Sequence, residues 1–311
     1  MATAALPNHH LLDPNATAIP FKLFGAAPSP EAAGLFASLP TSEKPRANLS
    51  KPARDYLAGL ALSDPDENDE AGAALWHHAL GIAFSPLYLT ENKDAVQGDY
   101  PRVPPPCLRE DLEASAALGK RLANLLDTEA AVDGVDAPPI EPPLDLFGVP
   151  SSVTGGTLKP GNLSVEAGWG HSDGHRPVMP GRGRIIGHEA YEPDTEAAIR
   201  KALEATALPP DDMLARLGPP LDIYLNEVAF WACVPQAVWE YRIGGYQVIK
   251  KWLSYREHSV LGRALSADEV EYVTAMVRRL AAIVLMEPAL NANYAKARDD
   301  AFNWSKCLNR G

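Results

Sequence analysis

The chain has 311 residues, of which 46% are hydrophobic and 22% charged, and its formal net charge is −12 at pH 7. This composition is that of a folded globular protein and excludes a chain that is disordered throughout. The acidic balance argues against a protein that grips nucleic acid over its whole surface, although it leaves room for a local basic groove. The length allows two cores, at about 150 residues per domain.

No segment of the sequence indicates secretion or membrane insertion. No apolar run approaches the roughly 18 residues that a membrane span requires, and the N-terminus lacks the basic start and apolar core of a signal peptide. Cys107, Cys233 and Cys307 stand far apart and form no zinc-binding pair, which suits a reducing compartment. We therefore expect a cytoplasmic protein with no membrane partner.

The first half of the chain is predicted to be mainly helical. Residues 1–48 contain many prolines and few periodic apolar positions, which indicates an extended N-terminal arm. Apolar spacing then predicts helices over 51–62, from Leu75 to Ile82 and over 109–126. The proline-rich segment 101–106 between them is expected to be extended. Residues 49–128 are therefore predicted to form a helical subdomain.

The second half has a different pattern. Residues 129–160 are rich in proline, glycine and acid, which indicates a joint. Short strands are predicted at 163–167, 183–188, 223–225, 228–233 and 238–243, with one helix near 195–207. Ser266 and Glu269 have the spacing of a capping box at the start of a last helix, predicted to end at Glu287 before Pro288. We therefore expect an α+β fold, in which a mixed strand-and-helix domain at 161–311 follows the mainly helical part.

The stretch from Trp239 to Glu257 is the most informative in the chain. It is predicted to form a strand, a break at Gly244-Gly245 and a helix from Tyr246 onward. Steps of 100° per residue divide that helix into an apolar half, with Tyr246, Val248, Ile249, Trp252, Leu253 and Tyr255, and a polar half, with Gln247, Lys250, Lys251 and Ser254. The glycines leave little bulk beside the helix N-terminus, where free N–H groups can receive a phosphate. A lysine face that is simply solvated explains the pattern equally well.

Three blocks of sequence carry a resemblance to a known family. They are HHALGIAFSPLYLTENKDAVQGDYPRVPPP at 77–106, IYLNEVAFW at 223–231, and VPQAVWEYRIGGYQVIKKWLSYRE followed by LSADEVEYVTAMVRRLAAIVLMEP within 234–288. These blocks resemble the C-terminal specificity domain of type ISP restriction-modification enzymes and related adenine-N6 DNA methyltransferases. The likeness implies an α+β target-recognition domain that reads double-stranded DNA in a phage-defence system and presents it to an adenine methyltransferase domain.

The catalytic motifs of such a methyltransferase do not occur in this sequence. Amino-methyltransferases hold the flipped adenine with an Asn-Pro-Pro-aromatic motif, which is missing here. Gly155-Gly156 and the Gly181–Gly183 segment also lack the strand-loop-helix setting of a cofactor loop. We therefore expect neither catalysis nor a cofactor in this chain alone. The resemblance implies that S-adenosylmethionine binds to a methyltransferase partner, present as a separate subunit or as a further domain.

Candidate DNA contacts follow from the chemistry of recognition, which needs cations for phosphates and amide or planar groups for base edges. Lys250 and Lys251 are candidate phosphate contacts, and Gln247 and Ser254 are candidates for base edges or further phosphates. Arg242 adds charge to the same stretch, whereas Arg256 is expected to pack near the helix end. A second cluster lies in the glycine-flanked loop HRPVMPGRGR, for which a mobile surface loop is an equal alternative; it contains Arg176, Arg182 and Arg184.

Two other functions are compatible with the sequence. One is a protein-interaction subunit whose acidic surface docks a methyltransferase, with DNA contact secondary. The other is a metal-dependent hydrolase centred on His171, Asp173 and His175, with His188 as a further ligand, because imidazole and carboxylate suit zinc or manganese. His-x-Asp-x-His in a glycine-rich loop is a weak signal, and we expect no metal site.

Overall fold

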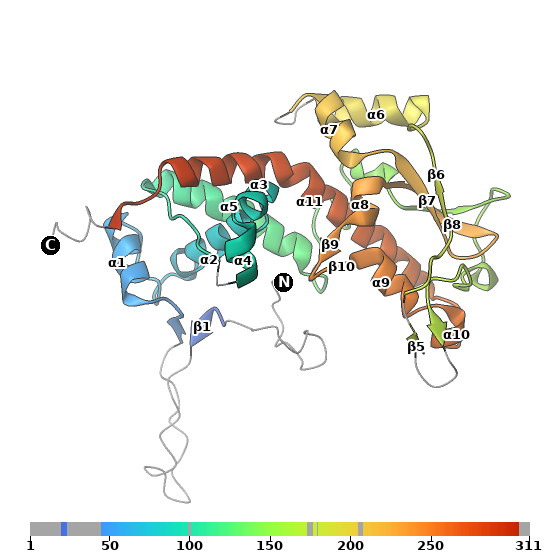
Figure 1. The fold of residues 1–311 in the computed structure, drawn as a ribbon, viewed down its shortest axis with the longest axis horizontal. Helices are drawn as coiled ribbons and strands as arrows, with labels where there is room; N and C mark the ends of the chain where they lie inside the picture. The colour runs from blue at the N-terminus through green and yellow to red at the C-terminus, as the bar shows by residue number, and fades with distance from the viewer. Residues whose placement is uncertain are drawn as a thin grey trace, which may run out of the picture. The chain divides into compact units, whose positions relative to one another are not determined.

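The computed structural model describes residues 20–23, 45–98, 101–172, 177–178, 180–204 and 208–304 (Figure 1). Helices and antiparallel sheets make up an α+β fold, as the sequence predicts. The chain divides into two compact units, one formed by residues 124–288 and the other by residues 2–123 with 289–311. The last segment is thus grouped with the N-terminal half, whereas the sequence pattern places it with the C-terminal domain.

The N-terminal unit is built mainly from helices, each started by a polar side chain where the sequence offers one. Its elements are β1 (Lys22–Leu23), β2 (Arg46–Ala47), α1 (Lys51–Gly59), α2 (Asp69–Ala83), α3 (Pro86–Glu91), α4 (Lys93–Gly98), α5 (Arg109–Leu126) and the last turns of α11 (Ala267–Asp299). Ser50, Asn68 and Ser85 accept backbone N–H groups at the starts of α1, α2 and α3. The expected boundaries of the helix at 109–126 are confirmed.

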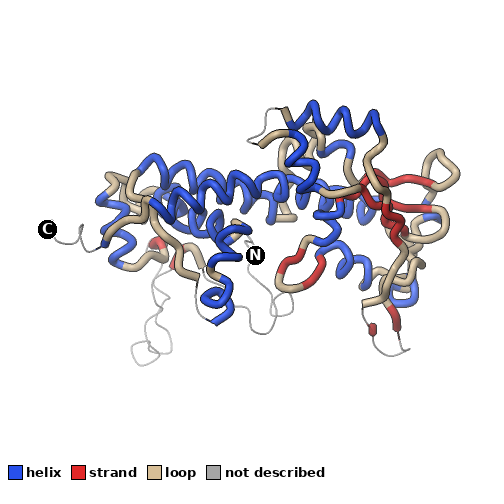
Figure 2. Tube along the Cα trace, turned by 45° about the horizontal axis from the view of Figure 1, so that its top comes forward, coloured by secondary structure: helices blue, strands red, loops and turns tan. Residues whose placement is uncertain are grey.

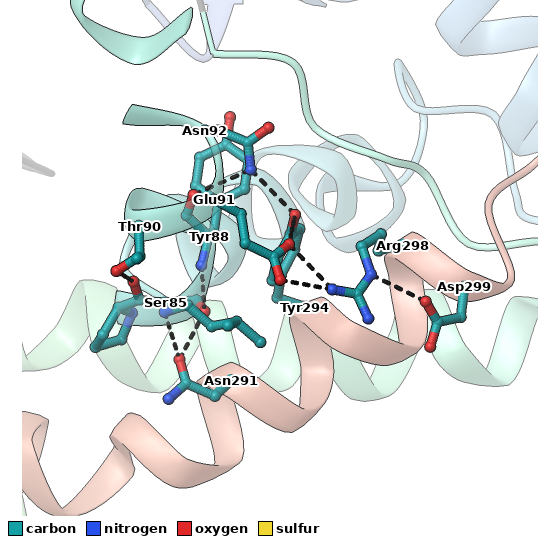
Figure 3. A network of polar contacts seen from close by, with 11 residues as sticks. Ser85, Tyr88, Thr90, Glu91, Asn92, Asn291, Tyr294, Arg298 and Asp299 are labelled. Atoms are coloured by element: carbon teal, nitrogen blue, oxygen red, sulfur yellow. Dashed lines mark hydrogen bonds and ion pairs between the residues drawn. The ribbon is translucent and has the colours of Figure 1, made fainter. Parts of the chain in front are cut away.

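A polar network joins α3 to the last turns of α11 within this unit (Figure 3). The side-chain oxygen of Asn291 accepts from the Ser85 hydroxyl at 2.8 Å and from the Leu87 backbone N–H at 2.9 Å. At the other end of α3, Glu91 accepts from the Tyr294 hydroxyl at 2.9 Å and pairs with Arg298. The Asn291 side chain therefore accepts from two donors at the start of α3, while the Glu91 carboxylate joins the last turn of α3 to Tyr294 and Arg298 of α11.

Buried His78 makes the stability of this unit sensitive to pH. Its side chain is 1% exposed, with Nδ1 2.6 Å from the Ser115 hydroxyl and Nε2 3.1 Å from the Pro104 carbonyl. Because a carbonyl can only accept, Nε2 carries the proton and Nδ1 accepts from Ser115. Burial lowers the pKa of His78 to about 4, although the Pro104 carbonyl acts in the opposite direction.

The folded chain therefore binds this proton less tightly than the unfolded chain, whose histidine pKa is about 6.5. Stability that is present at pH 7 is lost as the pH falls from about 6.5 towards 4. We expect the free energy of unfolding to drop by about 2 kcal/mol between pH 7.5 and pH 5. Urea unfolding at both pH values measures this drop, and the variant His78→Gln should show a smaller one. An equal drop in the variant would contradict a role for His78.

The second unit holds most of the strands, which Figure 2 shows in red. Its elements are β3 (Val149–Ser152), β4 (His171–Ser172), β5 (Pro177–Val178), β6 (Ile185–Gly187), α6 (Pro193–Leu203), α7 (Pro210–Leu217), β7 (Pro220–Tyr224), β8 (Ala229–Pro235), α8 (Gln236–Glu240), β9 (Arg242–Ile243), β10 (Tyr246–Gln247), α9 (Val248–Ser254), α10 (His258–Leu261) and the first part of α11, besides two short 3₁₀ turns at Leu144–Leu146 and Pro160–Asn162. The main sheet is antiparallel with order β3-β8-β7-β6. Strand β6 lies at its edge, and Ile185 and Ile186 are 38% and 39% exposed.

Three expected elements differ in the structure. Residues 163–167 form no strand. Leu163 and Val165 are buried, but their carbonyls accept from the N–H groups of residues 265 and 258, and the Glu166 N–H donates to the carbonyl of residue 225, so no ladder with a neighbouring strand forms. Of the strand expected at 238–243, the first half belongs to helix α8, which starts directly after Pro235, and only Arg242–Ile243 is strand, as β9. Helix α11 continues through Pro288 to Asp299, because buried residues on both sides of the proline, Val284 and Leu290 among them, outweigh its roughly 3 kcal/mol cost.

Candidate nucleic-acid interface

The two glycines of the candidate site form a hairpin turn. Gly244 and Gly245 have φ values of +59° and +83°, and Ile243 pairs with Tyr246 across the turn. Two successive residues with positive φ are the requirement of the tight turn that suits a hairpin, and glycine meets it without strain. The helix expected from Tyr246 onward therefore does not follow the glycines directly, because strand β10 lies between them. Helix α9 begins three residues later, at Val248, and has only seven residues (orange in Figure 1).

The four residues expected on the polar half of this helix are placed differently from one another. Lys251 is exposed and Lys250 partly exposed. Gln247 directly precedes the helix, and its side chain donates to the Trp239 carbonyl at 3.3 Å. Ser254 is 1% exposed, and its hydroxyl donates to the Lys251 carbonyl at 2.8 Å, so it offers no group to a ligand at the surface. The two lysines remain as the outward-facing members of the set.

Aromatic rings lie at the surface around these lysines. Tyr246 and Tyr255 are expected on the buried half, but they are 54% and 47% exposed. The ammonium of Lys251 lies 3.5 Å from the centre of the Tyr246 ring. The Arg256 guanidinium lies 3.9 Å from the centre of the Trp252 ring. The exposed face of α9 and its flanks therefore combines cations with aromatic rings, a combination that also occurs where proteins contact nucleic acids.

Glu269 pairs with two arginines that follow α9, Arg256 and Arg263. Arg263 donates to both of its carboxylate oxygens, at 2.6 and 3.0 Å, and the Arg256 Nε lies 3.6 Å from it. The hydrogen bond from Arg263 is the main cause that lowers the pKa of Glu269 to about 2. Glu269 also accepts from the Ser266 N–H while Ser266 accepts from the Glu269 N–H, which confirms the predicted capping box. Arg256 has the structural role that the sequence indicates.

Trp169 is the buried residue against which Gly183 packs, between Arg182 and Arg184. Its ring is fully buried, lies 5.2 Å from the Trp239 ring and donates to the Tyr224 carbonyl at 2.7 Å. A Cβ on Gly183 would lie 2.0 Å from this ring, so only glycine fits between Arg182 and Arg184. The buried carboxylate of Glu257 accepts from the backbone N–H groups of residues 168–170. The loop before β6 is thus fixed at its base.

Arg184 is held over an aromatic stack beside an open pocket. Its guanidinium lies 4.3 Å from the centre of the Tyr224 ring, which stacks on Phe230 at 4.9 Å. The pocket has a volume of about 550 Å³, and its polar lining residues include Asn162, Ser164, Glu166, Arg184, Asn226 and Glu227. No sequence pattern predicts this pocket, because its members come from three separate segments and have no shared spacing.

Of the four candidate metal ligands, the structure describes His171 and His188. Arg176, Asp173 and His175 lie outside the described residues. His171 is exposed in β4, and His188 Nε2 lies 2.9 Å from an Asp222 oxygen, which gives it a single carboxylate partner. Within the described ranges, no group of three or more His, Cys, Asp or Glu side chains could hold a metal ion.

The remaining candidate cations share one property. Within the described part of the chain, none of them forms an ion pair with a carboxylate; they are Arg182, Arg184, Arg242, Lys250 and Lys251. Other arginines of the same unit do form such pairs, namely Arg200, Arg216, Arg256, Arg263 and Arg279. The acidic chain therefore neutralises part of its positive charge and leaves the candidate residues available to an external anion.

A family model of the type ISP C-terminal specificity domain matches residues 204–279. The matched region runs from the end of α6 to the first part of α11, and it includes β7, β8, the β9–β10 hairpin and α9. The resemblance at 223–231 and at 234–279 is confirmed, whereas the block at 77–106 lies outside the match. No curated protein and no solved structure matches the chain.

Residues 204–279 are thus similar to the C-terminal specificity domain of type ISP restriction systems. Among the described residues, no helix is both long and apolar enough to cross a membrane.

Proposed function

We propose that the unit formed by residues 124–288 binds double-stranded DNA in a sequence-specific manner, as the target-recognition module of a type ISP-like restriction-modification or adenine-N6 methyltransferase system. The chemistry belongs to an adenine methyltransferase domain or subunit that holds S-adenosylmethionine. The observation that carries this proposal is the set of five cations without ion pairs among the described residues, in a chain whose net charge is −12. Three of the five, Arg242, Lys250 and Lys251, lie within the segment that matches the specificity domain.

Charge availability is the physical reason for this assignment. A lysine paired with a carboxylate must break that pair before it can neutralise a phosphate, whereas Lys250 and Lys251 have no such pair within the described ranges. Each neutralised phosphate releases condensed counterions, which makes binding depend steeply on salt. Because the chain is acidic overall, we expect the isolated chain to bind weakly and the methyltransferase partner to add positive surface.

Replacing Lys250 and Lys251 by alanine should weaken binding to a pool of mixed-sequence duplexes uniformly across sequences. The slope of log affinity against log salt concentration should fall by about 1 for each lysine that contacts a phosphate. Fluorescence anisotropy of a labelled duplex at several salt concentrations measures both quantities.

The matched control for this experiment is the pair Lys93→Ala and Lys201→Ala, which removes the same charge from α4 and α6. Equal losses in the two double variants would mean that only net charge matters. Unchanged affinity in the Lys250 and Lys251 variant would place the interface elsewhere.

A methyltransferase-docking subunit is the second candidate function. The observation in its favour is the exposed apolar edge of the sheet, where Ile185 and Ile186 lie in β6. Substitution of both isoleucines by serine, which removes the apolar side chains and adds no charge, should reduce association with the methyltransferase more than DNA affinity of the isolated chain; co-sedimentation of the two proteins and fluorescence anisotropy of a labelled duplex measure the two effects.

A further inference from the structure

The open pocket beside Arg184 is built on a rigid frame. The turn between β7 and β8 is fixed by Asn226, whose side-chain oxygen accepts from the N–H groups of Val228 and Ala229. The amide of the same side chain donates to the carbonyls of Asn162 and Ser164 on the facing segment, at 2.8 and 2.7 Å. One side chain thus holds two walls of the pocket together. Groups displayed by this turn therefore keep a defined position before any ligand arrives.

Arg184 brings a preorganised cation to the pocket. Stacking on Tyr224 orients the planar guanidinium and reduces the rotamer freedom that binding would otherwise cost. The N–H groups of the guanidinium make no hydrogen bond with any described residue. These donors are free to form two parallel hydrogen bonds to one acceptor pair. In the major groove, the O6 and N7 atoms of guanine are the acceptor pair that arginine fits best.

Two carboxylates, those of Glu166 and Glu227, line the same pocket, and their charge determines which ligands can bind there. Glu166 accepts from the Ser164 hydroxyl at 2.7 Å, whereas Glu227 is exposed at the tip of the fixed turn and has no partner among the described residues. With Arg184 as the cation, the charged lining groups sum to a negative value, which repels a phosphate. A carboxylate instead accepts from the exocyclic amine of a base, and the N4 amine of cytosine is its usual partner in the major groove.

We propose that this pocket reads base identity, with Arg184 contacting a guanine and Glu227 a cytosine in the major groove, while Lys250 and Lys251 contact phosphates. This inference rests on the proposed function and adds the residues that select the sequence. It assigns the two kinds of contact to two surfaces of the same unit. A phosphate contact contributes to affinity for every sequence, whereas a base contact contributes only where the right base is present.

The test is selection of the full chain on a randomised duplex library, followed by sequencing of the enriched DNA. We expect the wild type to enrich a motif that contains a fixed guanine and a fixed cytosine. Arg184→Ala should lose about tenfold of the preference at the guanine and keep the other positions. Glu227→Gln should move the preference at the cytosine to adenine, because an amide donates to N7 and accepts from N6 of adenine.

Matched controls are Arg121→Ala and Glu189→Gln, which make the same chemical changes at exposed positions that do not line the pocket. Thermal melting of each variant establishes that it is folded. Base preferences that stay unchanged in both pocket variants would overturn the inference and leave the proposed function standing. A uniform loss of binding across all sequences in folded Arg184→Ala would also overturn it, because Arg184 would then be a phosphate contact. A wild type that enriches no motif would overturn the proposed function, and the inference with it.

Discussion

Replacing Arg279 by methionine should lower the free energy of unfolding by roughly 3–5 kcal/mol. Arg279 is 4% exposed, and its Nε donates to Asp136. The rest of the guanidinium donates to four backbone carbonyls, those of residues 124, 125, 127 and 130. Methionine fills a similar volume but leaves a mostly buried carboxylate and these carbonyls without their donor. Urea unfolding followed by circular dichroism measures the change.

A second substitution distinguishes the energetic cost of the unpaired Asp136 carboxylate from that of the unpaired backbone carbonyls. In the double variant Arg279→Met with Asp136→Asn, the unpaired carboxylate is gone, so the loss should be smaller than in the single variant. Arg263→Ala is the surface control: it removes a pair with Glu269 that is half-exposed on the arginine side, and it should cost less than about 1 kcal/mol. Equal losses for Arg279→Met and Arg263→Ala would contradict the assignment of Arg279 as a buried anchor.

Replacing Trp169 by alanine is the second change with a large expected effect, a loss of roughly 3–5 kcal/mol in the free energy of unfolding. The ring is fully buried against Trp239 and Gly183, and the cavity that alanine leaves cannot close because Gly183 has no side chain. The Tyr224 carbonyl also loses its donor. Urea unfolding followed by the fluorescence of the remaining tryptophans measures the loss.

Trp169→Phe distinguishes packing from hydrogen bonding. Phenylalanine keeps a ring in the site and removes the N–H donor, so it should cost less than alanine, with about 1–3 kcal/mol from the unpaired carbonyl. Trp304, which is 37% exposed, provides the control for loss of an indole near the surface. If Trp169→Ala were no more destabilising than Trp304→Ala, Trp169 would not be the residue that fixes the loop before β6.

Local signals in the sequence determine the elements that are predicted correctly. The helix at 109–126 is recognisable because Leu112, Leu122 and Leu125 repeat at helical spacing, and all three are buried. Ser266 and Glu269 identify the start of α11 because a capping box involves only residues three apart. Such elements depend on few distant contacts, so the sequence alone is sufficient to place them.

The incorrect predictions concern residues whose position is set by contacts with parts of the chain that are distant in sequence. Ser254 has the spacing of an outward-facing residue, but its side chain is buried in the fold. Tyr246 is predicted within a helix, but the helix starts two residues later, at Val248. Tyr246 lies in strand β10 of the hairpin instead, and its side chain is exposed to solvent. Helix α7 is absent from the predicted elements although it has the signal of proline at its first position followed by two aspartates. The pocket at Arg184 could not be predicted, because its walls meet only in the folded chain.

The exposed edge of β6 has a consequence for handling the protein. The backbone N–H and C=O groups on the outer side of an edge strand can pair with another chain, and the exposed apolar side chains of Ile185 and Ile186 favour such pairing. The strand is only three residues long and is flanked by Arg184 and His188, which limits how far such pairing can extend. Self-association should therefore appear in concentrated samples, and it should weaken when DNA occupies Arg184 at the start of this strand.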